Sequence, residues 1–266
     1  MEFKKLLALP VLLGIFFWGV HSSLAESFPF SDVSTDHWAY DDIQNLYDLG
    51  IISGKSANTY DPNSSITVAE FVKISMETAS VNAEEWLEND FFTDGGWGAL
   101  QYISENDWFY SYINAAYLID LFDKTEPDID DQNYEPDYTN YLYRYPNTPI
   151  SRVNATNILM NSVNLDECMS APEENALIDI EDWSSPSNEN YEKWLSINTA
   201  AYYGIITGFD EDGHPFKPSD QLTRTEAAAI ASRAYEAFFM EGAQHAELVN
   251  LDFSPNHESA SPGCQR

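Results

Sequence analysis

One short pattern occurs near both ends of the chain, and this repetition constrains the fold more than any other feature. Ile43 precedes Gly50 by the same separation as Ile197 precedes Gly204. The apolar spacing before each glycine is typical of an amphipathic helix. Glycine readily adopts the left-handed conformation that ends helices, so each glycine is the predicted helix end.

A second pattern follows the first: a proline stands the same distance before an apolar residue in three places. These pairs are Pro62 with Ile66, Pro146 with Ile150, and Pro218 with Leu222. Thr67 and Glu70 then form the S/T-x-x-E pattern of a helix N-terminus, and Thr223 and Glu226 repeat it. The repeated unit is therefore predicted to be helix, loop, helix.

These motifs resemble the S-layer homology domain. The residues that carry the resemblance are Phe30-Ser31-Asp32-Val33, Trp38, Gly50-Ile51-Ile52, Gly204-Ile205-Ile206 and Leu222-Thr223-Arg224-Thr225-Glu226. The resemblance implies a mainly α fold of three tandem repeats, at 28–82, 90–164 and 176–240, packed as a pseudo-threefold helical prism. The middle repeat is divergent and carries an acidic insertion near 128–137, and 241–266 form a polar tail.

The same resemblance implies a non-catalytic protein of the cell envelope. Members of the family attach noncovalently to cell-wall polysaccharides, often pyruvylated, or to peptidoglycan-linked polymers. No cofactor is implied. A protein-docking or structural module that has lost sugar binding is the alternative, because Val68 and Asn154 depart from the family motif in two of the three copies.

The N-terminus predicts export. Lys4 and Lys5 precede an apolar stretch that ends near Ser23-Leu24-Ala25, the small-residue pattern that signal peptidases accept. We therefore expect residues 1–25 to be a removed signal peptide, with the mature chain at the cell surface or in a periplasm. An uncleaved membrane anchor is less favoured, because the stretch is shorter than the roughly 20 residues that span a bilayer.

The charge limits the partners. The formal net charge is −32, which disfavours general binding to nucleic acids or anionic membranes because both need a basic surface. An aromatic fraction of 14% indicates a folded rather than a disordered acidic chain.

The candidate polysaccharide-binding residues lie at the start of the second helices. Arg224 and Arg152 occupy a first helical position, where a cation opposes the helix dipole and an anionic ligand would offset that cost. We expect free backbone N–H groups there to assist the binding of a carboxylate. Ordinary surface ion pairs are the alternative role for the arginines, and helix capping is the alternative for Thr223 and Glu226.

Three tryptophans are further candidates. Trp38 and Trp108 stand before first helices and could stack on a sugar ring, as could Trp194, whereas filling space between repeats is the alternative role. We expect three aspartates to cap the turn before the first helices instead of binding ligand: Asp32, Asp94 and Asp179.

Two cysteines, Cys168 and Cys264, would form one disulfide in an oxidising compartment, and two unpaired thiols are the alternative. Neither has a histidine at metal-ligand spacing, so no metal site is predicted. The chain also contains none of the common nucleophile, zinc-protease or phosphate-loop motifs, which argues against an enzyme.

Overall fold

The computed structural model describes residues 28–88, 103–119, 121–122, 142–163, 178–185, 187–188, 190–209 and 215–240. These residues form helices joined by loops, with isolated backbone bridges but no named strand among them, which confirms the mainly α class. The helices are α1 (Tyr40–Asp48), α2 (Val68–Thr78), α3 (Ala83–Glu88), α4 (Tyr110–Leu118), α5 (Arg152–Ser162), α6 (Tyr191–Tyr202) and α7 (Arg224–Tyr235). Shorter elements are η3 (Leu142–Arg144), η5 (Ile178–Trp183) and η6 (Glu236–Met240).

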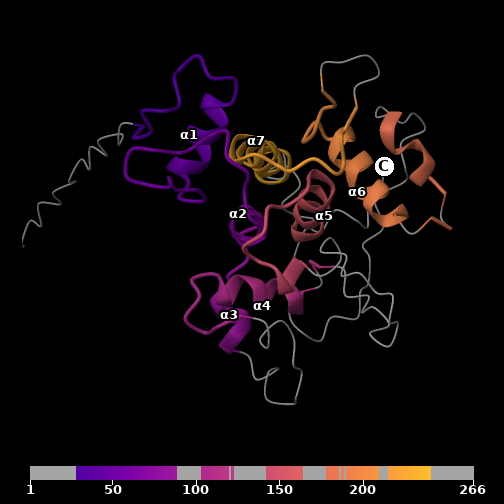
Figure 1. The fold of residues 1–266 in the computed structure, drawn as a ribbon, viewed down its shortest axis with the longest axis horizontal. Coiled ribbons are helices and arrows are strands. Elements are labelled where there is room, and N and C mark those ends of the chain that lie inside the picture. Colours follow the sequence, from indigo (N-terminus) through magenta and orange to yellow (C-terminus); the bar gives the residue numbers. More distant parts are fainter. Residues whose placement is uncertain are drawn as a thin grey trace, which may run out of the picture.

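Three helices lie at the centre and the others surround them (Figure 1). The central helices are α2, α5 and α7, and their inward residues are almost all fully buried. We call 28–88 the first unit, the described part of 103–163 the second unit and that of 178–240 the third unit. Each unit contributes one outer helix (α1, α4 or α6) and one central helix.

The outer helices pack on the central helices of other units. Helix α1 packs on α7, α4 on α2, and α6 on α5. Each unit therefore buries its first helix against the unit that precedes it, and the first unit uses the third. This cyclic exchange joins the third unit to the first, and among the described residues each outer helix packs on the central helix of another unit.

Three backbone hydrogen bonds form a closed ring where the central helices begin. The amide of Ile66 donates to the carbonyl of Leu222 (3.0 Å), Leu222 to Ile150 (2.9 Å), and Ile150 to Ile66 (3.0 Å). Their side chains are at most 1% exposed. Each of the three residues gives one bond and accepts one, so the ring fixes all three units at once.

The glycines at the ends of the outer helices behave as the sequence predicted. Gly50 has φ +77° and Gly204 has φ +70°, both in the left-handed region where a side chain is strained. The amide of the next residue, Ile51 or Ile205, bonds back to a carbonyl of α1 or α6. These turns direct the chain into the loops that reach the neighbouring unit.

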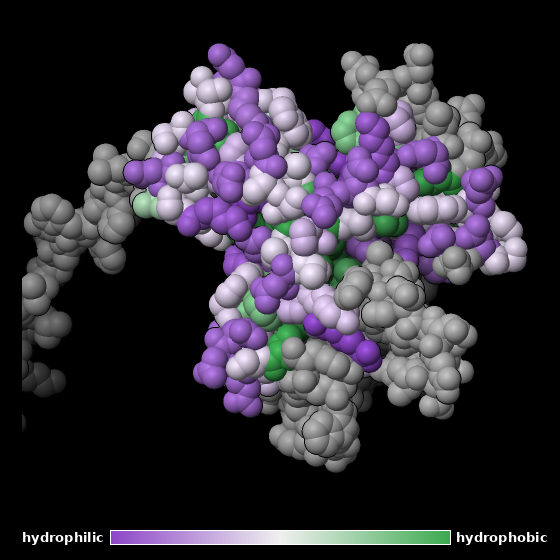
Figure 2. Space-filling view, viewed as in Figure 1, coloured by the Kyte–Doolittle hydropathy of each residue, from purple (hydrophilic) through white to green (hydrophobic). Residues whose placement is uncertain are grey.

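The visible surface is largely polar, with only small separate apolar spots (Figure 2). None of the helices in the described part of the chain is both long enough and apolar enough to cross a membrane.

Several predicted features lie outside the described residues. These are the signal peptide, the Cys168–Cys264 disulfide, Asp94, the insertion near 128–137 and the tail at 241–266.

Gly54 provides a test of loop packing. A Cβ at this position would lie 2.5 Å from Phe30 Cε1, 2.5 Å from the carbonyl oxygen of Ser56 and 2.6 Å from that of Thr59. We expect Gly54→Ala to lower the free energy of unfolding by about 2 kcal/mol, the usual cost of overpacking, in urea titrations. The neighbouring control, Ser53→Ala, should stay within about 0.5 kcal/mol because that side chain is exposed. Equal stability of the two variants would contradict the packing described here.

Candidate functional site

The second helix of each unit, which is α2, α5 or α7, begins with a side-chain cap, as the sequence predicted for α2 and α7. Thr67 accepts the amide proton of Glu70, and the Glu70 carboxylate accepts the Thr67 amide, which completes a capping box. Thr223 and Glu226 form the same box at α7. In α5, Ser151 caps the amide of Asn154. The capping role of these threonines and glutamates is thus confirmed, whereas a contact with ligand stays a prediction.

The amides next to the caps are not free, so that part of our expectation is wrong. The first helical amide of each central helix donates to a loop of the neighbouring unit: Val68 to Thr148 (2.9 Å), Arg152 to Asp220 (2.8 Å) and Arg224 to Ser64 (2.9 Å). The second helical amides donate to the carbonyls of the loop prolines: Ala69 to Pro146, Val153 to Pro218 and Thr225 to Pro62. These helix starts therefore hold the units together, and their amides cannot also bind a carboxylate.

Arg224 lies in the contact between the third and first units, which we call the third–first seam. Its Nε donates to the carbonyl of Tyr60 (2.8 Å), its Nη2 to that of Ser53 (2.9 Å) and its Nη1 to Glu70 Oε1 (3.2 Å). The residue is 6% exposed. The Tyr60 hydroxyl in turn donates to the Arg224 carbonyl (2.9 Å). The anion that offsets the helix dipole is thus a protein carboxylate from the next unit.

Arg152 has the equivalent position between the second and third units, the second–third seam. Its Nε donates to the carbonyl of Phe216 (2.8 Å) and its Nη1 to Glu226 Oε1 (2.7 Å). The residue is 8% exposed, and burial lowers the pKa of its guanidinium while the carboxylates of Glu226, Asp220 and Asp179 oppose that shift. Both candidate arginines are therefore buried inter-unit contacts, which is not the surface ion pair considered as their alternative.

The first–second seam lacks this pair. Val68 stands where the other units have arginine, and Asn154 stands where they have glutamate. Lys55 does not replace the missing cation. Its Nζ lies 2.5 Å from Glu70 Oε1, so it belongs to the third–first seam beside Arg224.

The aspartates hold loops and do not cap the turn before the first helix, which corrects our prediction for the two that are described. Asp32 accepts the amides of Tyr60 (2.9 Å) and Asp61 (2.8 Å). Asp179 accepts those of Phe216 (2.7 Å) and Lys217 (2.6 Å). Asp61 and Lys217 have φ of +63° and +58°, so each aspartate stabilises a strained loop residue next to an arginine contact.

The three tryptophans differ in exposure. Trp38 and Trp108 are 62% and 56% exposed, so neither fills the space between units, and both rings are accessible to a ligand. Each stands directly before an outer helix, at matching positions of the first and second units. Trp194 is 6% exposed and belongs to the buried core, where its ring stacks on Tyr191, so it cannot present its ring to a sugar.

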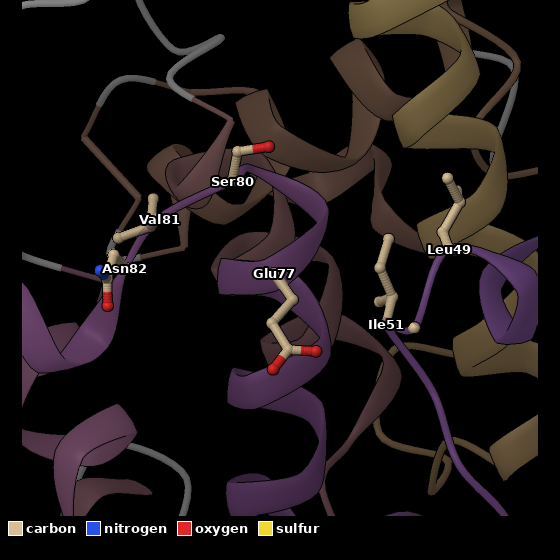
Figure 3. A pocket seen from close by; sticks show the side chains of 7 residues that line it. Leu49, Ile51, Glu77, Ser80, Val81 and Asn82 are labelled. Atoms are coloured by element: carbon tan, nitrogen blue, oxygen red, sulfur yellow. The ribbon is translucent and has the colours of Figure 1, made fainter. Parts of the chain in front are cut away.

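An open hollow of about 260 Å³ lies at the other end of α2 (Figure 3). Leu49, Ile51 and Val81 supply its apolar walls and Glu77 its charge. Both oxygens of Glu77 already accept hydrogen bonds, from the Tyr112 hydroxyl (2.6 Å) and Lys73 Nζ (2.6 Å). Among the described residues, no group of three or more His, Cys, Asp or Glu side chains is arranged to hold a metal ion.

Comparison with known proteins identifies two matched segments and several larger relatives. The family model described as "S-layer homology domain" matches residues 29–72 and 189–228. The chain is 29% identical to Exoglucanase XynX of Acetivibrio thermocellus over 78% of its own length and 16% of that protein. It is 22% identical to the S-layer protein sap of Bacillus anthracis over 91% of its length and 26% of that protein. It is 27% identical to Amylopullulanase of Thermoanaerobacterium thermosulfurigenes over 76% of its length and 9% of that protein. The chain thus spans about a quarter or less of these relatives.

Removal of the Arg224 side chain tests its structural role. Arg224→Met would leave the carbonyls of Tyr60 and Ser53 without this donor and would remove one of the two cations paired with Glu70. We expect the free energy of unfolding to fall by about 3 kcal/mol, as is typical when one partner of a buried pair is lost. Lys193→Met removes a cation from the outer helix α6 and should cost less than about 0.5 kcal/mol. Wild-type stability in the Arg224 variant would show that the seam does not depend on this side chain.

The acid stability of the protein should depend on Glu70. Burial favours a higher pKa for this carboxyl, but hydrogen bonds from Lys55 and the Thr67 amide and the charges of Lys55 and Arg224 lower its pKa below the usual 4.5. A lowered folded-state pKa stabilises the fold above about pH 4.5, and this stabilisation disappears as the pH falls through the folded-state value.

We therefore expect Glu70→Gln to have a lower free energy of unfolding than wild type at pH 6. We expect this difference to be smaller at pH 3. Urea unfolding at both pH values measures this change. The matched control is Glu192→Gln, an exposed substitution on α6. If the Glu70 variant loses the same free energy of unfolding at both pH values, the lowered pKa of Glu70 is contradicted.

Proposed function

This chain is an S-layer homology domain protein, and from that premise we propose that it is a non-catalytic cell-envelope protein that attaches noncovalently to a wall polysaccharide or peptidoglycan-linked polymer. We further propose that it is exported, that its three units span 28–82, 90–164 and 176–240, and that they form a pseudo-threefold prism. The observation that carries the proposal is the match of residues 29–72 and 189–228 to the family model. The third unit also forms an arginine-containing seam with each of the other two units.

The seams and the tryptophans supply two kinds of contact for a sugar polymer. Arg224 and Arg152 lie in two of the seams, and Thr223 and Glu226 hold the start of α7 beside them. A guanidinium is the side chain best suited to pair with a carboxylate on a sugar. The exposed rings of Trp38 and Trp108 suit stacking on the apolar face of a sugar.

Docking to another envelope protein is the second candidate function. It is favoured by the first–second seam, which lacks the arginine–glutamate pair and where Val68 is fully buried, and by the burial of both arginines. The two candidates differ in their response to salt, because a contact between arginine and a sugar carboxylate weakens as charges are screened, whereas an apolar protein contact does not.

Co-sedimentation of the mature chain with purified wall sacculi from the strain that encodes it tests the proposal. We expect salt-sensitive pelleting, and we expect the double variant Trp38→Ala/Trp108→Ala to bind at least about tenfold more weakly, since each aromatic contact contributes about 1 kcal/mol. Tyr202→Ala is the matched control because that ring is 73% exposed and lies at the other end of an outer helix.

Both expectations have a clear contrary outcome. If wild type does not pellet at any salt concentration, polymer attachment is contradicted and protein docking becomes the favoured function. Pelleting that the tryptophan variant leaves unchanged would keep attachment and remove the tryptophans from the site.

A further inference from the structure

The hollow at the end of α2 has an equivalent in the third unit, and there two aromatic rings fill it. Counted from the N-caps of α2 and α7, Asn82 corresponds to Phe238, and counted from the helix-ending glycines, Leu49 corresponds to Tyr203. The rings of Phe238 and Tyr203 meet edge to face, with their centres 6.0 Å apart. The first unit has no ring at either position, and the hollow of about 260 Å³ lies there instead.

The chain leaves the two central helices in different ways, which explains the difference. Helix α7 continues as η6, and η6 carries Phe238 to the end of α6. Helix α2 ends in a tight turn, in which Ser80 has φ +58° and the amide of Val81 donates back to the carbonyl of Met76 (2.8 Å). The chain therefore turns away before any side chain can cover the end of α1.

The walls of the hollow are apolar side chains that a partner can reach (Figure 3). Leu49 is 43% exposed, whereas Ile51 and Val81 are 5% and 9% exposed. Glu77 is the charged residue of the lining, and both of its oxygens already accept hydrogen bonds. The hollow therefore suits an apolar ring, which needs no hydrogen-bond partner on its faces, better than a polar ligand.

Acidic side chains surround this apolar surface. Asp48, at the end of α1, is exposed, and so is Glu84. Burial raises the pKa of the Tyr112 hydroxyl, and the carboxylates of Glu77 and Glu84 raise this pKa further, which places both carboxylates beside the same ring. The nearby cation, Lys73, is already paired with Glu77. Charge complementarity therefore favours a basic partner and disfavours a second copy of a chain with a net charge of −32.

We propose that the hollow at the end of α2 is a docking site for a partner polypeptide segment that presents an aromatic side chain between basic residues. The ring would take the place that Phe238 has in the third unit, against the apolar walls of the hollow. Lysine or arginine beside the ring would face Asp48 and Glu84. The hollow lies at the opposite end of α2 from the seams, so this inference does not depend on polymer attachment.

Titration of the mature chain with short acetylated peptide amides tests the site. The methyl signals of Leu49, Ile51 and Val81 in NMR spectra report on the hollow. We expect the peptide Lys-Phe-Lys to shift these signals with a dissociation constant on the order of 1 mM, as one buried ring allows. Lys-Ala-Lys should bind at least about tenfold more weakly because it lacks the ring. Glu-Phe-Glu should bind at least about threefold more weakly at low salt because of its charge.

Three variants locate the binding. Asn82→Phe introduces the ring that the third unit has at this place, and it should abolish the shifts caused by Lys-Phe-Lys. Leu49→Asn removes an apolar wall and should weaken binding at least about fivefold. The matched control is Asn63→Phe, at an exposed position before the start of α2, and it should bind like wild type. Thermal unfolding of each variant shows whether a lost shift reflects a lost fold.

The contrary outcomes are distinct from those of the sacculus assay. Unchanged methyl signals, equal binding of Lys-Ala-Lys, or wild-type binding by the Asn82 and Leu49 variants would each overturn the docking site. If Glu-Phe-Glu binds as well as Lys-Phe-Lys, the partner is not basic and its assignment is wrong. If the same signals shift with protein concentration alone, a second copy of the chain occupies the hollow, which also contradicts the proposed partner.

Discussion

The three backbone hydrogen bonds among Ile66, Ile150 and Leu222 are the constraint on which the remaining architecture depends. Each bond contributes only about 1 kcal/mol in net terms, but the bonds are cyclic and buried, so none can break without leaving an unpaired group. They set the start of α2, α5 and α7 at one level. The first two amides of each helix then donate to carbonyls of the neighbouring unit, and the arginines of α5 and α7 contact that same unit.

Closure of this ring explains why so many polar groups of the motif are structural. The helix dipole of α7 would disfavour Arg224, yet Glu70 of the next unit compensates for that charge. The same arrangement places Arg152 against Glu226. Since these carboxylates also complete capping boxes, each glutamate links the start of its own helix to the preceding unit. A binding site at such a seam therefore uses groups that the fold already requires.

Much of the local structure was predictable from the sequence because it depends on neighbouring residues. The capping boxes at Thr67 and Thr223 and the left-handed glycines Gly50 and Gly204 follow from short-range spacing. The seam partners were harder to predict, because Glu70 and Arg224 are far apart in the chain. One signal was available: Val68 and Asn154 replace the arginine and the glutamate of the same cyclic pair. That joint replacement indicates contact between consecutive units.

The helix-loop-helix units, their helix ends and the family resemblance could all be predicted from the sequence, since these depend on spacing and on residue-specific backbone preferences. The occupied amides at the helix starts, the loop contact of Asp32 and the position of Lys55 beside Arg224 became known only from the packing of the units. It also decided which tryptophans are exposed. The physical reason is cyclic packing: each outer helix and each arginine finds its partner in another unit, and spacing within one unit contains no information about that partner.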